Sequence, residues 1–195
     1  MNTIAYNAPN INGAKGSFYD DLARGKQGEM SDEVESIIRL LYPAYSLTSN
    51  TSLELDKSGA DIKVANNWLP SFIQTKVLDK DWDLIKSRPN GTLLEYGQSS
   101  DGINVDRAGW WGSEKSQSHI LINFYKDSKR FDCHFMPSLK RVFQQCGNGL
   151  VVSDCFPLGT MPSYAGSRVW YSHWIVVPNE TLAKLGAPLL LSGYL

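Results

Sequence analysis

The chain has 195 residues, of which 42% are hydrophobic, and its 20 acidic and 19 basic residues leave a formal charge of −1. This length fits one well-filled core and is too short to make two large domains. The balanced charge argues against a broadly basic nucleic-acid coat protein, although a local basic stripe beside an acidic site would still let an enzyme bind DNA.

The start of the chain carries no targeting signal that we recognise. Residues 1–16 are rich in Asn, Gly and Ala and lack the basic start and apolar stretch of a secretory leader or membrane anchor. We expect them to be a flexible lead and residues 17–195 to form a single domain. The cysteines lack paired spacing and are expected to be reduced thiols. A cytoplasmic protein without membrane contact is therefore expected.

Secondary structure is readable in the first half of the chain. Apolar residues recur at helical spacing between residues 18 and 41, which predicts one interrupted helix or two short helices in line. Strand-like patterns follow at about residues 51–56, 60–65 and 71–78, and the turns between them favour an antiparallel meander. Residues 79–118 mix Pro, Gly, Asn and Asp with isolated aromatics, so much of this stretch is expected to be loop.

The second half gives a clearer pattern. Residues 119–125 and 130–136 alternate around a polar turn and predict a β-hairpin, after which Pro137 and Ser138 open a helix to about residue 145. A glycine-broken region precedes a strand at 169–177 and a short helix at 179–185 that Gly186 ends. Together these elements predict an α/β fold, with a mixed β-sheet flanked by helices.

The most informative feature is the run Gln74-Thr75-Lys76 inside an apolar strand segment. Alternation along a strand points Gln74 and Lys76 to one face, and a hairpin with residues 60–65 would bring Asp61 beside them. One carboxylate, one amide carbonyl and one cation suit a divalent metal held against a phosphate. In the plainer interpretation Asp61 caps a turn, and Lys76 packs its stem while its charged end stays in water.

Asp61 followed thirteen residues later by Gln74-x-Lys76, with Glu29 on the preceding helix, resembles the signature of the PD-(D/E)XK nuclease superfamily. Residues 18–29 resemble the "DL..G..GE" helix of its phage and bacterial members. Residues 94–96, 101–103 and 108–111 resemble a further stretch found in some of them. The resemblance covers roughly residues 18–140 and implies a restriction-endonuclease-like core with the element order αβββαβ.

The resemblance also implies an activity, Mg²⁺- or Mn²⁺-dependent hydrolysis of DNA. It assigns Asp61, Gln74 and Glu29 as metal ligands, and Lys76 as the residue that stabilises the charge on the attacked phosphate. This agrees with the chemistry of Mg²⁺, which prefers oxygen ligands and lowers the pKa of a bound water. Glu33, which shares a helix face with Glu29, is the alternative helix residue.

Two further residues are expected to contact the nucleic acid. Lys63 shares a strand face with Asp61 and would reach a phosphate, and Trp68, in the turn between the two strands, would overlook the bound DNA and stack on a base. The sequence leaves open whether two copies pair, as many nucleases of this type do to cut both strands.

Gln74 departs from the family pattern, which has an acidic residue at this position. The substitution removes one negative charge from the metal site, so metal affinity should fall. This keeps a second hypothesis open: a nuclease-like fold with impaired chemistry that acts as a DNA-binding or protein-binding module, for instance a phage factor acting on host machinery. A third, a purely structural interaction protein, would be favoured if the chain's own loops covered the face carrying Asp61.

Overall fold

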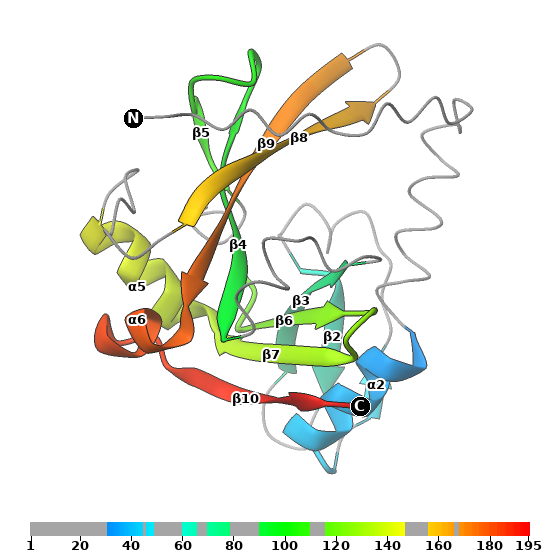
Figure 1. Cartoon of the computed structure of the whole chain (residues 1–195). Helices are drawn as coiled ribbons and strands as arrows, with labels where there is room; N and C mark the ends of the chain where they lie inside the picture. Colours follow the sequence, from blue (N-terminus) through cyan, green and yellow to red (C-terminus); the bar gives the residue numbers. More distant parts are fainter. Residues whose placement is uncertain are drawn as a thin grey trace.

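The computed structural model of the chain describes residues 31–44, 46–48, 60–65, 70–78, 90–109, 116–146, 156–165 and 168–195. Within these ranges it is a mixed α/β protein with two β-sheets and flanking helices (Figure 1). The predicted fold class is confirmed, whereas the αβββαβ core stays a prediction. The predicted strand at residues 51–56, and residues 18–30 of the predicted helix, lie outside the described residues.

The larger sheet has six strands and carries the predicted hairpin and two of the three strands of the predicted meander. In spatial order its strands are β1 (Ser46–Thr48), β2 (Ile62–Ala65), β3 (Pro70–Leu78), β6 (Ile120–Tyr125), β7 (Arg130–Phe135) and β10 (Leu189–Tyr194). All neighbours are antiparallel except β3 and β6, which run parallel. The antiparallel pairing of the predicted strands 60–65 and 71–78 and the β6–β7 hairpin are thus confirmed, and the parallel pair makes the sheet mixed.

One face of this sheet is covered by α2 (Asp32–Leu41). The Ser31 hydroxyl caps the helix by accepting a hydrogen bond from the backbone N–H of Val34. Val34, Ile37 and Ile38 follow helical spacing and are fully buried, and burial of such a side chain stabilises the fold by about 1.5–3 kcal/mol. They pack against sheet residues that share one face: Ile62, Val64, Ile73, Ile120, Ile122 and Phe124.

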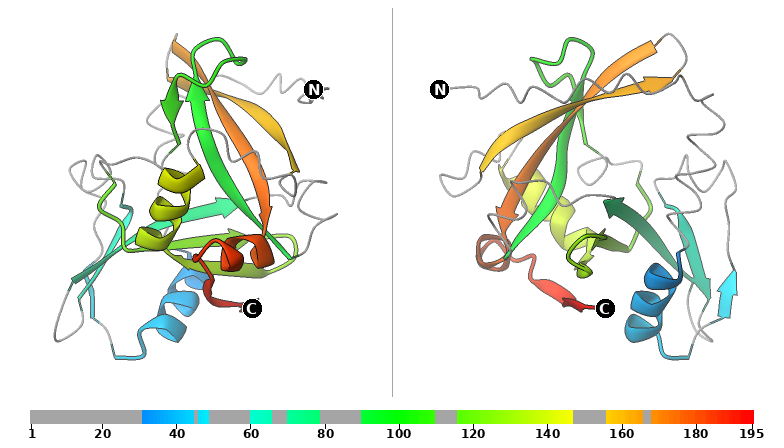
Figure 2. Two further views of the ribbon diagram at one scale, coloured as in Figure 1. Left: turned by 90° about the vertical axis from the view of Figure 1, so that its left-hand side faces the viewer. Right: turned by 45° about the vertical axis from the view of Figure 1, so that its right-hand side comes forward.

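The opposite face is covered by α5 (Met136–Cys146) and α6 (Asn179–Lys184), so that α2 and α5 lie on opposite sides of the sheet (Figure 2). Leu121 points to this side, between two residues that point to α2, as alternation along a strand requires. It belongs to a buried cluster with Met136 and Leu139 of α5. Both helices confirm predictions, and Gly186, with φ of 89°, follows the end of α6.

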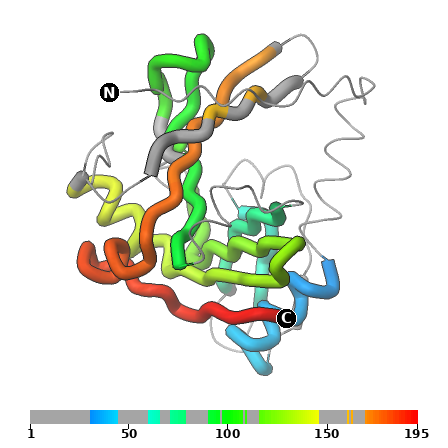
Figure 3. The backbone as a smooth tube through the Cα atoms, in the orientation of Figure 1, coloured from blue at the N-terminus to red at the C-terminus, as the bar shows by residue number. Residues whose placement is uncertain are grey.

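A second sheet of four antiparallel strands rises from this side of the molecule. Its order is β5 (Arg107–Ala108), β4 (Gly91–Ser99), β9 (Arg168–Pro178) and β8 (Phe156–Ala165). Figure 3 shows β4 and β9 running side by side away from the larger sheet. Leu94 of β4, and Ile175 and Val177 of β9, enter the same buried cluster as Leu121, so the two sheets share a core.

The loop-rich interpretation of residues 79–118 was wrong for β4, a strand of nine residues. Its glycines suggested turns, yet Gly97 lies at a register shift in the β4–β9 pairing, where a β-carbon would be 2.3 Å from the Val105 side chain. Likewise the glycine-broken region contains β8, and β10 near the end of the chain forms an edge strand of the larger sheet. Among the described residues, none of the helices has the length and apolar character needed to cross a membrane.

A buried polar cluster joins β7 to the start of β4. Arg130 Nη2 lies 2.7 Å from Asp132 Oδ2, and these side chains are only 7% and 2% exposed. The same guanidinium donates to the carbonyl oxygen of Gly91 and lies 4.2 Å from the ring centroid of Tyr125. Burial raises the pKa of Asp132, while the neighbouring Arg130 opposes that shift. The hydrogen bond from Arg130 to the Gly91 carbonyl oxygen therefore connects the two sheets, in addition to the apolar packing.

His134 lies on the same face of β7 and is fully buried. Because the Thr92 hydroxyl donates to Asn179 Oδ1 at 2.6 Å, its oxygen accepts from His134 Nε2 at 2.9 Å. His134 Nδ1 has no hydrogen-bond partner among the described residues. Burial lowers the pKa of His134 from 6.5 to about 4, which keeps the ring neutral.

This histidine should make the protein less stable in acid. Between pH 6.5 and about 4 the unfolded chain takes up a proton that the folded chain excludes, so the free energy of unfolding should fall by up to about 1.4 kcal/mol per pH unit. His134→Gln keeps a hydrogen-bonding group near Thr92 but does not titrate, and its stability should change less over this range. Urea unfolding of both proteins across the range tests this, and equal slopes would contradict it.

Candidate functional site

Asp61 and Gln74 lie side by side at the end of the β2–β3 pair. Asp61 directly precedes β2, and the pairing of Ile62 with Ile73 places it opposite Gln74. The Gln74 Nε2 atom donates a hydrogen bond to Asp61 Oδ2 at 2.7 Å. The predicted adjacency of these two side chains is confirmed, and their chemical roles stay predictions.

The carboxylate of Asp61 is fixed by the backbone and side chain of Thr75 as well. Asp61 Oδ2 accepts from Thr75 N at 2.6 Å and from Thr75 Oγ1 at 3.1 Å. The backbone N–H of Asp61 donates to the carbonyl oxygen of Ile73 at 2.8 Å, so the backbone of Asp61 is also bonded to β3. The Asp61 side chain therefore extends the β2–β3 ladder by one position, a structural role close to the turn cap of the plainer interpretation.

Lys76 and Lys63 lie on the same face of the sheet as Gln74. Ile62 and Ile73 point to the α2 side, so alternation turns Lys63, Gln74 and Lys76 to the other face. Gln74 is only 6% exposed, whereas Asp61, Lys63 and Lys76 are half-buried. Lys63 and Lys76 thus place two ammonium groups on the face that carries Gln74, and ammonium groups suit the binding of an anion such as phosphate.

The donor set fits a divalent cation that keeps most of its water. Because an ionised carboxylate only accepts hydrogen bonds, the Gln74 amide turns its nitrogen to Asp61 and its oxygen Oε1 away. Rotation of this amide would present two oxygen ligands, and Mg²⁺ is commonly held by one or two protein oxygens with waters and phosphate oxygens. No group of three or more His, Cys, Asp or Glu side chains that could hold a metal occurs among the described residues.

Of the two helix residues considered as ligands, Glu29 and Glu33, the described residues include only Glu33. Glu29 and Trp68 lie outside the described residues. Glu33, the alternative to Glu29, accepts a hydrogen bond from Lys129 Nζ at 3.0 Å and belongs to α2, which covers the opposite face of the sheet. Its pKa is lowered, first by a backbone hydrogen bond and then by Lys129. Glu33 is therefore part of a surface ion pair on α2, and its role as the alternative to Glu29 stays a prediction.

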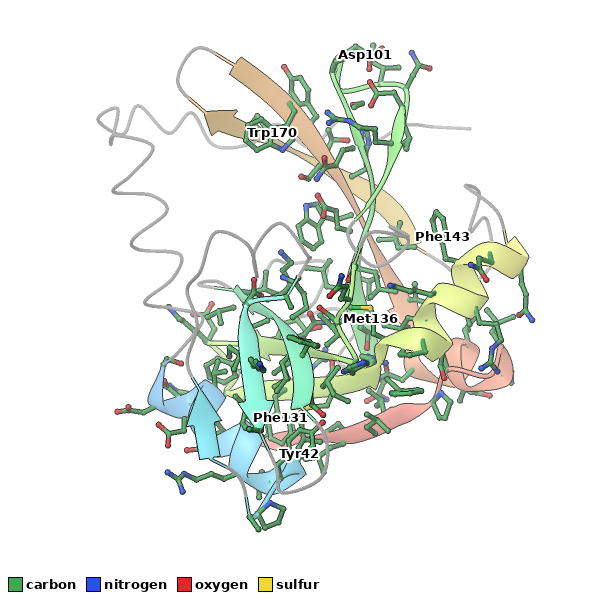
Figure 4. All side chains as sticks on the ribbon, turned by 180° about the vertical axis from the view of Figure 1, so that it is seen from behind. Tyr42, Asp101, Phe131, Met136, Phe143 and Trp170 are labelled. Atoms are coloured by element: carbon green, nitrogen blue, oxygen red, sulfur yellow. The ribbon has the colours of Figure 1, made fainter. Side chains whose placement is uncertain are left out.

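The stretch of the resemblance around residues 101–103 forms the turn between β4 and β5. Asp101 Oδ1 accepts from the backbone N–H groups of Ile103 and Asn104 at 2.8 and 2.9 Å. These hydrogen bonds hold the pKa of Asp101 down at about 2. Figure 4 shows Asp101 at the far end of the smaller sheet, while Phe131 and Tyr42 lie near α2 and Met136 begins α5. Asp101 thus stabilises its own turn.

The histidines are spread over separate places. His119 Nδ1 accepts from the backbone N–H of Phe72 at 3.3 Å, and His134 contacts Thr92. His173 Nε2 lies 2.7 Å from Ser99 Oγ, and both residues are buried, with His173 3% exposed. A buried serine is out of reach of a substrate, so this pair is structural.

No family model, no curated protein and no solved structure matches this chain. The site is therefore interpreted from its own geometry.

Proposed function

We propose that this protein is a Mg²⁺- or Mn²⁺-dependent deoxyribonuclease that hydrolyses phosphodiester bonds. The observation that carries the proposal is the 2.7 Å hydrogen bond between Gln74 and Asp61, which brings two predicted metal ligands together on the face that also carries Lys76. The order α2, β1, β2 and β3, followed by a β6 parallel to β3, supports the αβββαβ core. Between β3 and β6 the described residues contribute β4 and β5.

Each residue of the site has a distinct task in this proposal. Asp61 and Gln74 would hold the cation, which when bound supplies a Lewis acid and a water of lowered pKa. Lys76 would keep a fixed positive charge beside the phosphate and stabilise the negative charge that develops on it. Lys63 would bind a neighbouring phosphate and so position the DNA strand on the site.

Incubation of the purified protein with linear, circular and branched DNA tests the proposal. We expect cleavage of at least one of these forms with Mg²⁺ or Mn²⁺, and no cleavage when EDTA removes the metal. Cleavage of circular DNA would show endonuclease activity. Absence of cleavage of all three forms, with both metals, would contradict the proposal.

Lys76→Met should lower the rate of cleavage strongly. Methionine keeps the length and packing of the lysine stem but removes the charge, and loss of one such stabilising group typically costs about 100- to 1000-fold in kcat. The measurement is single-turnover cleavage at saturating protein, which separates chemistry from DNA binding.

Lys63→Met is the matched control, because it removes a charge from the same face of the sheet. Its expected effect is on DNA affinity, with little change in the single-turnover rate. Equal effects of the two substitutions on that rate would show that Lys76 has no special role.

A second function is favoured by one observation. Gln74 is neutral, only 6% exposed and already satisfied by Asp61, so it binds a cation less readily than an exposed carboxylate would. The chain would then be a nuclease-like module that binds DNA or a protein without cutting. Binding of DNA that is unaffected by metal, together with absence of metal uptake, would favour this function over the nuclease.

A further inference from the structure

Thr75 lies between Gln74 and Lys76 on β3. Because side chains alternate along a strand, the Thr75 side chain points to the opposite face of the sheet from theirs. Sequence patterns therefore assign it to the core, and it is indeed only 3% exposed. Nevertheless its hydroxyl and its backbone N–H both donate to the same atom, Asp61 Oδ2, at 3.1 and 2.6 Å. Thr75 thus holds the carboxylate from the side of β3 that faces α2, while Gln74 approaches from the opposite side.

We propose that Thr75 is a positioning residue for the Asp61 carboxylate, fixing the direction of that group toward a divalent cation. The inference rests on the proposed metal site. With Oδ2 held by Thr75, the plane of the carboxylate and the direction of Oδ1 are set before the cation arrives. Threonine suits this task because its branched β-carbon restricts rotation about χ1, so the hydroxyl does not need to be ordered when metal binds.

The hydroxyl matters most once metal is bound. Rotation of the Gln74 amide to present Oε1 would withdraw one of the donors to Oδ2, and the two hydrogen bonds from Thr75 would remain. Groups that orient a metal ligand by hydrogen bonding typically contribute about 10- to 100-fold in metal affinity. Thr75 therefore has a role that neither of its neighbours in the motif can supply.

The test is calorimetric titration of the full chain with Mn²⁺, for wild type, Thr75→Val and Thr75→Ser. Valine keeps the shape of the side chain and removes the donor, and we expect about 10-fold weaker Mn²⁺ binding. Serine keeps the hydroxyl, so its affinity should lie near that of wild type. Thr181→Val, at a buried threonine of α6 remote from the motif, is the control for removal of a buried hydroxyl and should bind Mn²⁺ like wild type.

Unchanged Mn²⁺ affinity of Thr75→Val, or equal losses in the valine and serine variants, would overturn the positioning role. If Thr75→Val does not fold, Thr75→Cys, whose thiol is a weak donor, takes its place in the same comparison. Failure of the proposed function gives a different result, since wild type itself would then take up no Mn²⁺ and the positioning role would fall with it. Loss of binding in Asp61→Asn with no effect of Thr75→Val would overturn the positioning role alone.

Discussion

Asp61→Asn is expected to abolish metal-dependent cleavage of DNA while the protein stays folded. The amide keeps the shape of the carboxylate and an oxygen that accepts from Thr75, but it removes the negative charge that attracts a divalent cation. Alanine is a poorer choice, because it would leave the donors of Gln74 and Thr75 unpaired, at about 1–3 kcal/mol for each buried group.

Cleavage of DNA in Mg²⁺ and Mn²⁺, together with thermal unfolding, measures both parts of this expectation. Asp127→Asn is the matched control, because Asp127 is an exposed carboxylate in the turn between β6 and β7. That variant should cleave like wild type. Cleavage by Asp61→Asn at the wild-type rate would remove Asp61 from the metal site.

Asp132→Ala should lower the free energy of unfolding by about 3–5 kcal/mol, because it leaves the Arg130 guanidinium buried without its carboxylate. The contacts of Arg130 with the Gly91 carbonyl oxygen and the Tyr125 ring supply no formal negative charge. Since the paired Arg130 also joins the two sheets through its hydrogen bond to Gly91, the loss should appear in the global unfolding transition.

Urea unfolding near neutral pH measures this loss, and two variants serve as comparisons. Arg130→Met combined with Asp132→Leu removes both charges and should recover much of the stability. Glu180→Ala breaks the pair of Glu180 with Lys184, whose side chains are 79% and 72% exposed, and should have little measurable effect. A loss in Asp132→Ala no larger than in Glu180→Ala would show that the buried pair does not stabilise the fold.

Local patterns predicted the elements that depend on local physics. The apolar spacing of Val34, Ile37 and Ile38 marks the buried face of α2, and the polar turn after Tyr125 marks the β6–β7 hairpin. By contrast, β4 and β8 owe their structure to pairing with β9, which lies far along the chain. Taken locally, the glycines in these strands suggest turns. The strands form nevertheless, because contact with distant residues stabilises them, and a local pattern does not show such contacts.

In the candidate site, too, some features could be predicted from local patterns and others could not. The adjacency of Asp61 and Gln74 followed from the alternation and register of two neighbouring strands, and the hydrogen bond between them agrees with it. The contribution of Thr75 could not be predicted, because half of it comes from a backbone N–H and its side chain belongs by alternation to the core face. The pairing of Glu33 with Lys129 was equally hidden, since these residues lie 96 positions apart.

The central claim is that the Asp61 and Gln74 side chains bind one divalent cation. Calorimetric titration of wild type and Asp61→Asn with Mn²⁺, without DNA, tests it most directly. We predict saturable uptake of Mn²⁺ by wild type and none by Asp61→Asn. Equal uptake by both proteins, or none by wild type, would contradict the claim.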